Sequence, residues 1–63
     1  MIGYVARDRD GEIYIHGEKP TYDDAIEGWY SAPGMINITG KFPKFDNMSY
    51  IEPIKVEIKL ERL

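Results

Sequence analysis

The sequence predicts an all-β or nearly all-β domain of four or five short antiparallel strands, arranged as a curled sheet or a small open barrel. Apolar and charged residues alternate without a break from Ile54 to Glu61, which is the period of a strand with one buried face. Asp10-Gly11 lies between two β-rich runs, as in a hairpin. A chain of 63 residues forms at most one small domain, so residues 1–63 are expected to share one core.

The first expected element is a hairpin of strands at 2–8 and 12–17. Its turn contains Asp10-Gly11, because a type I′ turn needs positive φ at both central positions and glycine adopts this angle without strain. Gly17 and Pro20 then end the second strand. His16, the only histidine, falls on the polar face of this pattern and is expected to be a partly exposed surface residue.

The pairing register of this hairpin follows from the length of its loop. A three-residue loop is disfavoured because it sets Ile13 and Ile15 beside Val5 and Arg7. A two-residue turn, or a four-residue loop from Asp8 to Gly11, instead gathers the apolar residues on one face. That expected apolar face consists of Ile2, Tyr4, Ala6, Ile13 and Ile15.

The segment after the hairpin has two interpretations. Thr21 can cap a helix, Asp23 and Asp24 suit a helix start, and Gly28 suits an exit, which together predict one helical turn near 22–27. So short a helix has little stability of its own, and a structured loop is the alternative.

Three further strands are predicted at 28–31, 35–39 and 53–61. The connecting residues 41–53 show neither a helical nor a strand period and are expected to form an ordered loop. The expected core consists of Tyr4, Ile13, Ile15, Trp29, Ile36, Ile38, Val56 and Ile58.

Composition argues against several classes of site. The chain has no cysteine and one histidine, which excludes disulfides and a thiolate or multi-histidine zinc site within one chain. Asp8-Arg9-Asp10-Gly11-Glu12 resembles the start of an EF-hand loop, but Ile13 and Lys19 occupy the positions of the loop glycine and the bidentate acid. We therefore expect no metal, no cofactor and no enzymatic activity. No leader or membrane-spanning pattern is visible, which predicts a cytoplasmic protein without a membrane partner.

The leading functional hypothesis is a non-catalytic protein-interaction module that self-associates. The charges of the last strand favour this, because lysines can face glutamates when a second copy runs antiparallel to form a homodimer. Aromatic residues are favoured interface anchors, although the sequence favours burial of Trp29 in the core. The candidate interaction surface consists of Trp29, Tyr30, Lys55, Glu57, Lys59 and Glu61.

Two alternative functions involve nucleic acid. The segment Lys41-Phe42-Pro43-Lys44-Phe45 combines bases with aromatic rings, as in binding of single strands. Nearby Asp46 favours the alternative, in which both phenylalanines fill the core and the lysines stay in water. The net charge of −3 argues against such binding. The other alternative is an acidic decoy that inhibits a nucleic-acid-binding protein, which requires one acidic surface formed by Asp8, Asp10, Glu12, Glu18, Asp23, Asp24 and Glu27.

One set of short motifs recurs in a known group of proteins: Ala6-Arg7-Asp8-x-Asp10-Gly11-x-Ile13-Tyr14, Lys19-Pro20, Trp29, Phe42-Pro43 and Glu52-Pro53-Ile54-Lys55-Val56-Glu57. In these residues the chain resembles short orphan proteins from gut anaerobes and their phages and mobile elements. Thr21-Tyr22 and Tyr50 depart from the pattern of this group, where a basic residue and a tryptophan are usual. No activity is established for that group, so the resemblance implies a context, a small accessory protein that acts by binding, and no site residues.

Overall fold

The computed structural model describes residues 2–32 and 34–57, which form six strands and one short 3-10 helix, η1. Strands β5, β2, β1 and β6 form a four-stranded antiparallel sheet in that order, and β3 and β4 form a two-stranded sheet. The elements are β1 Ile2–Arg7, β2 Ile13–His16, β3 Thr21–Asp23, β4 Gly28–Tyr30, β5 Met35–Asn37, η1 Pro43–Phe45 and β6 Ile54–Glu57.

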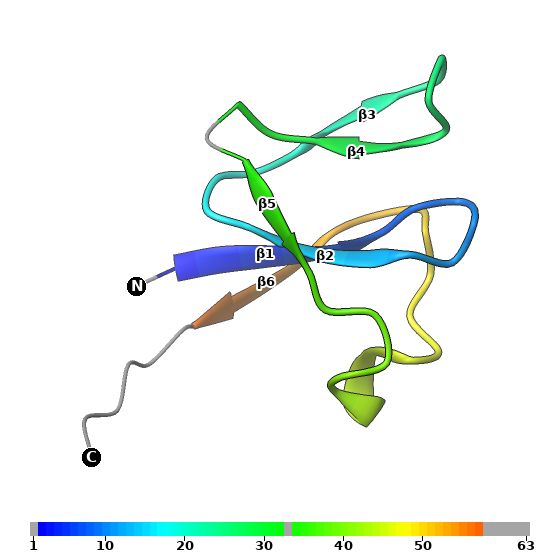
Figure 1. Ribbon diagram of the computed structural model, residues 1–63. Coiled ribbons are helices and arrows are strands. Elements are labelled where there is room, and N and C mark those ends of the chain that lie inside the picture. The colour runs from blue at the N-terminus through cyan, green and yellow to red at the C-terminus, as the bar shows by residue number, and fades with distance from the viewer. Residues whose placement is uncertain (1, 33, 58–63) are drawn as a thin grey trace.

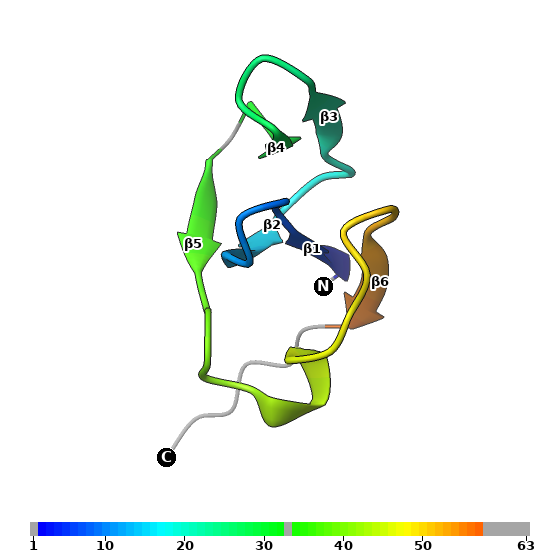
Figure 2. The ribbon, with the colours of Figure 1, turned by 90° about the vertical axis from the view of Figure 1, so that its right-hand side faces the viewer.

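The nearly all-β prediction is confirmed, and the expected strands are present with shorter ends. The described residues form an open sheet and a separate hairpin and do not close into a barrel. The hairpin β3–β4 lies on one side of the four-stranded sheet and η1 on the other (Figures 1 and 2). The last predicted strand is confirmed for 54–57, and its remainder, 58–61, lies outside the described residues.

The predicted register of the first hairpin is wrong. Arg7 pairs with Ile13, and Val5 pairs with Ile15, which is the arrangement that the sequence pattern disfavours. The Asp8 N–H donates to the Glu12 carbonyl (2.8 Å) and Gly11 has φ of 100°, so the loop spans residues 9–11 and ends in a left-handed glycine. Such three-residue loops combine a type I turn with a bulge.

This register gives the sheet two different faces. Val5, Ile13 and Ile15 share the face toward η1, where the core consists of the buried residues Val5, Ile13, Ile38, Phe45 and Met48. Arg7 lies on the same face, and its Nη1 donates to the Met48 carbonyl (3.1 Å). The opposite face contains Ala6 and His16, which are 0% and 1% exposed.

The expected core is correct only in part. Ile13 and Ile38 are buried, Tyr4, Ile15, Trp29 and Val56 are half-buried, and Ile58 lies outside the described residues. Ile36 is 68% exposed because β5 is an edge strand whose three residues all face solvent. Ile2, expected on the apolar face, is 45% exposed. Phe45 and Met48 fill the core instead, from the segment that shows no periodicity.

The helical turn expected near 22–27 is not formed. Residues 21–23 are strand β3, 24–27 are a turn, and 28–30 are β4, so the segment is a second hairpin. The Asp23 carboxylate accepts a hydrogen bond from the Ala25 N–H (2.9 Å), and Glu27 adopts a φ of 52°. Residues that favour a helix start also favour tight turns, because the same short side chains bond to nearby backbone groups.

Candidate functional site

An edge-to-face pair of aromatic side chains begins the candidate site. Tyr22 on β3 lies directly opposite Trp29 on β4, so both side chains project from the same face of the hairpin. Their ring centroids are 5.2 Å apart with an interplanar angle of 72°. This is one of the two favoured geometries for aromatic pairs.

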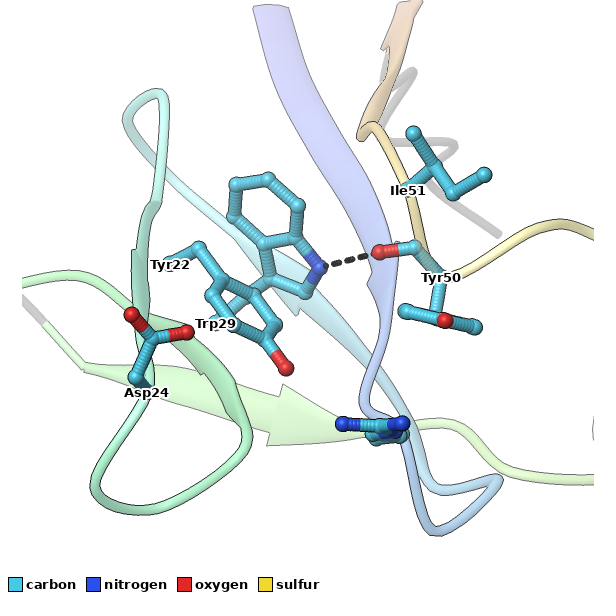
Figure 3. A pocket seen from close by; sticks show the side chains of 6 residues that line it. Tyr22, Asp24, Trp29, Tyr50 and Ile51 are labelled. Atoms are coloured by element: carbon cyan, nitrogen blue, oxygen red, sulfur yellow. Dashed lines mark hydrogen bonds between the residues drawn. The ribbon is translucent and has the colours of Figure 1, made fainter.

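Trp29 is held in place from two directions. Its Nε1 donates to the Tyr50 carbonyl (3.0 Å), as Figure 3 shows, and its backbone N–H donates to the Asp8 carboxylate (2.9 Å). The Arg9 guanidinium lies 5.7 Å from the centroid of the Tyr50 ring, within range of a cation–π interaction. Trp29, on the second hairpin, is therefore bonded both to the first hairpin, through Asp8, and to the segment before β6, through Tyr50.

These side chains surround an open hollow of about 420 Å³, which we call the aromatic hollow. Tyr50 and Ile51 form one of its sides and are 38% and 74% exposed. Figure 3 shows the space between this side and the Tyr22–Trp29 pair. The hollow is lined by Arg9, Tyr22, Asp24, Trp29, Tyr50 and Ile51.

A second hollow of about 490 Å³ shares Trp29 with the first, and we call it the lysine hollow. Its apolar lining is contributed by Tyr4, Trp29 and Pro53, and its charges by two lysines and one glutamate. The hollow is lined by Tyr4, Lys19, Trp29, Glu52, Pro53 and Lys55. Residues 50–53 thus form a continuous wall along both hollows.

The residues of the predicted interaction surface occupy different places. Trp29 is half-buried between the two hollows, and Lys55 lines the lysine hollow. Tyr30 is 56% exposed, and it pairs with Thr21 on the opposite face of the small hairpin from Trp29. Glu57 is exposed on β6, while Lys59 and Glu61 lie outside the described residues.

The segment 41–45 contributes no residue to the lining of the aromatic hollow or of the lysine hollow. Phe45 is in the core, whereas Phe42 is 49% exposed, so the expectation that both phenylalanines fill the core is wrong for Phe42. Lys41 and Lys44 are exposed, and the Lys44 Nζ lies 5.1 Å from the centroid of the Phe45 ring. Phe42 and Lys44 border a smaller apolar hollow of about 220 Å³ on the η1 side of the sheet.

Most of the acids in the first half of the chain lie at one end of the molecule. The β1–β2 loop and the β3–β4 turn are adjacent there, joined by a hydrogen bond from the Arg9 N–H to the Glu27 carbonyl (3.1 Å) (Figure 1). The connection between β2 and β3, which contains Glu18, lies at the other end (Figure 1). The Glu12 carboxylate accepts hydrogen bonds from Asn37 Nδ2 (3.0 Å) and Thr39 Oγ1 (2.8 Å), so it is engaged within the chain.

Four residues of the aromatic hollow were not identified from the sequence as site residues: Arg9, Tyr22, Tyr50 and Ile51. Asp24 was named as a functional residue only among the acids of the decoy hypothesis. Because residues 22–27 were interpreted as a helical turn or a loop, the pairing of Tyr22 with Trp29 across a hairpin was not predicted. A signal was present, because aromatic residues on both sides of a short Asp- and Gly-containing segment are also typical of a hairpin. Tyr50 and Ile51 belong to a loop without periodicity, so no local pattern places them beside Trp29.

His16 is buried, so its predicted exposure is wrong. Its Nδ1 lies 2.9 Å from the Ser31 hydroxyl, which donates to the Gly34 carbonyl (3.1 Å). Because a hydroxyl has one hydrogen, this arrangement assigns the proton of the first bond to His16 Nδ1. Nε2 is buried and has no hydrogen-bond partner among the residues that the structure describes. Burial lowers the pKa of His16 from its ordinary value of 6.5, and the Asp8 carboxylate opposes this shift.

We expect the free energy of unfolding to fall as the pH drops below about 6.5. In this range the unfolded chain binds a proton on His16 that the folded chain excludes, and the loss ends once the pH is below the lowered pKa of the folded state. Urea unfolding followed by the emission of Trp29, the only tryptophan, measures this between about pH 7.5 and about pH 5.

The control is His16→Asn, whose amide can replace Nδ1 toward Ser31 and cannot gain a charge. Carboxylates titrate in both proteins, so the difference between the two pH profiles isolates His16. Identical slopes for the two proteins below about pH 6.5 would contradict the assignment of a buried neutral imidazole.

Metal ligands do not cluster within residues 2–32 and 34–57, where no three His, Asp or Glu side chains meet. In the same part of the chain, no helix has the length and apolar character needed to cross a membrane. Comparisons of the chain with protein-family models, with curated proteins and with solved structures found no match.

Proposed function

We propose that this protein is a non-catalytic module that binds another protein through the aromatic hollow. The observation that carries the proposal is the meeting of Tyr22, Trp29 and Tyr50, from three separate segments, around a hollow that is open to solvent. Tyrosine, tryptophan and arginine are the residues that most often dominate binding energy at protein interfaces. The hydrogen bond from the indole to Tyr50 holds the tryptophan in place before a partner arrives, which reduces the entropy lost on binding.

The two nucleic-acid hypotheses have weaker support. Because Phe45 is in the core, Phe42 is the one phenylalanine of the 41–45 segment that is available for base stacking. The acidic decoy lacks one continuous surface, since Glu18 lies apart from the other acids. In addition, the carboxylates of Asp8 and Glu12 are engaged in hydrogen bonds within the chain.

The pair of His16 and Ser31 has the separation of a base and a nucleophile, but both residues are buried. His16 is 1% exposed and Ser31 is 5% exposed, so a substrate does not reach either side chain without opening the fold. The Ser31 hydroxyl also donates to the Gly34 carbonyl and not to the imidazole. This geometry supports a structural role for the pair, and the proposal therefore assigns no catalytic activity.

Ile51→Glu tests the binding proposal, with Ile36→Glu as the matched control. Both isoleucines are largely exposed, at 74% and 68%, but Ile51 lines the aromatic hollow and Ile36 lies on edge strand β5. Peptides selected from a phage-displayed random library against the native protein are titrated while the emission of Trp29 is recorded. We expect Ile51→Glu to weaken their binding about tenfold, about 1.4 kcal/mol, and Ile36→Glu to leave it unchanged. Equal binding to all three proteins would contradict the proposal.

We also propose that the chain forms a homodimer through β6. Among the described residues this strand is at the edge of the sheet, where the outward N–H and C=O groups of an edge strand can pair with another strand. An antiparallel pairing centred on Val56 places Lys55 of one copy opposite Glu57 of the other, twice per dimer. Cross-strand pairs of opposite charge each stabilise such a pairing by about 0.2 to 1 kcal/mol.

Exchange of the two charges tests the dimer. Lys55→Glu alone and Glu57→Lys alone each place like charges opposite each other at both pairs, and we expect the dissociation constant to rise about tenfold. The double variant restores opposite charges and is expected to dimerise like the native chain. Light scattering over a concentration series measures the mass. A monomeric native chain at high concentration, or a double variant as weak as the single ones, would contradict this interface.

A further inference from the structure

We propose that the partner segment is a proline-rich peptide in the polyproline II conformation, which lies across Trp29 and occupies both hollows. This inference rests on the proposed function and specifies its ligand. It follows from three properties of the two hollows: their aromatic lining, their arrangement along one wall, and their charges.

The lining suits proline. The aromatic rings of Tyr22, Trp29 and Tyr50 border the first hollow, and Tyr4, Trp29 and Pro53 border the second. Grooves between aromatic side chains are the general binding surface for polyproline II segments, whose conformation is fixed before binding. The indole N–H is bonded to the Tyr50 carbonyl. Arg9, Tyr22 and Tyr50 also line the first hollow, and their guanidinium and hydroxyl groups are donors that a ligand carbonyl can use.

The arrangement of the hollows suits the repeat of this helix. Residues 50–51 line the aromatic hollow and residues 52–53 line the lysine hollow, with Trp29 common to both. Corresponding residues of these two pairs are two positions apart in the sequence, which is at most about 7 Å along an extended chain. A polyproline II helix rises about 3.1 Å per residue, so residues two or three apart are separated by about 6 to 9 Å. Two prolines of one ligand can therefore enter the two hollows together.

The charges that line the two hollows indicate which hollow an acidic residue of the ligand would lie beside. The lysine hollow has Lys19 and Lys55 against Glu52, an excess of one positive charge, on a chain whose net charge is −3. The aromatic hollow is balanced, with Arg9 against Asp24. An acidic residue in the ligand is therefore favoured beside the lysine hollow and not at the other end.

Single-stranded nucleic acid is the competing ligand for aromatic side chains. Bases stack in series on rings that present their faces, whereas Tyr22 and Trp29 meet at an interplanar angle of 72°. Asp24 and the acidic net charge also oppose a phosphate backbone. The geometry therefore favours the peptide, and an oligonucleotide serves as the competing probe in the test.

The experiment uses the full chain and a synthetic peptide of repeated Pro-Pro-Ala triplets that ends in glutamates. Trp29 emission and amide chemical shifts report binding. We expect the peptide to perturb Trp29 and the residues of both hollows, and replacement of its prolines by serine to weaken binding at least about tenfold. Replacement of its glutamates by lysine, or Lys19→Glu in the protein, is expected to weaken binding about threefold. Ile51→Glu is expected to weaken it about tenfold and Ile36→Glu to have no effect.

The outcomes separate this inference from the function on which it rests. If peptides selected from the random library need an intact aromatic hollow but serine peptides bind as well as proline peptides, the polyproline inference fails and the binding function stands. If oligothymidylate alone binds in a manner sensitive to Ile51→Glu, both fail in favour of a nucleic-acid ligand. If no library peptide or proline peptide perturbs Trp29, both also fail.

Discussion

Replacing Phe45 with alanine will lower the free energy of unfolding by about 3 to 5 kcal/mol. Phe45 is 9% exposed and packs in the cluster with Val5, Ile13, Ile38 and Met48. A domain of this length has a total stability of about 3 to 9 kcal/mol, so the substitution removes at least about a third of it and unfolds the chain if the native stability is at the low end of this range. Urea unfolding followed by far-ultraviolet circular dichroism measures the change.

Phe42→Ala is the matched control, because it removes the same kind of side chain three positions before Phe45, at the start of η1. Phe42 is 49% exposed and touches Phe45 edge-on, with ring centroids 6.4 Å apart, so its loss is expected to cost about 1 kcal/mol. Phe45→Leu retains most of the apolar volume and keeps the effect measurable if the alanine variant does not fold. Equal costs for Phe42→Ala and Phe45→Ala would contradict the placement of Phe45 in the core.

Gly28→Ala is expected to lower the free energy of unfolding by about 1 to 3 kcal/mol. A Cβ at this position would lie 2.8 Å from the Cγ and Oδ1 atoms of Asp8, whose carboxylate accepts the Trp29 N–H. The side chain of Asp8 must move to make room, and the junction between the two hairpins loses this hydrogen bond. Trp29 emission should change as well, because the tryptophan is attached to this junction.

Two comparisons make the test specific. Gly17→Ala is the control, since nothing lies within 4 Å of its added Cβ, and we expect a change within about 0.5 kcal/mol. In an Asp8→Ala background the carboxylate is absent, so Gly28→Ala should cost less there than in the native chain. Equal costs in both backgrounds would show that the close approach of Asp8 is not the cause.

The strands were predictable because their signals are local. The alternation after Pro53 and the β-rich runs on both sides of Asp10-Gly11 place β6, β1 and β2 correctly. The register of the first hairpin was not predictable, because it depends on which loop length the rest of the fold favours. Asp8 is held by Trp29 and Arg9 by Glu27, and both contacts join residues far apart in the sequence.

The site was less predictable than the fold for the same reason. The residues before Gly28 have local preferences that fit either a helix start or a turn, and the pairing of Tyr22 with Trp29 decides between them. Trp29 itself was identified as a candidate, but the residues around it come from three separate segments. Phe45 and Tyr50 lie in one aperiodic loop, and only the folded structure shows that one enters the core and the other borders a hollow.

The open sheet has a consequence for the growth of assemblies. Among the described residues its two edges are β5, with three residues, and β6, whose charged residues are Lys55 and Glu57. If β6 of one chain added to β5 of the next, each junction would leave a fresh edge, and a ribbon without a defined end would result. Pairing of β6 with itself about a twofold axis, with Lys55 opposite Glu57, occupies that edge in both chains, so the dimer would present only its two short β5 strands to further chains.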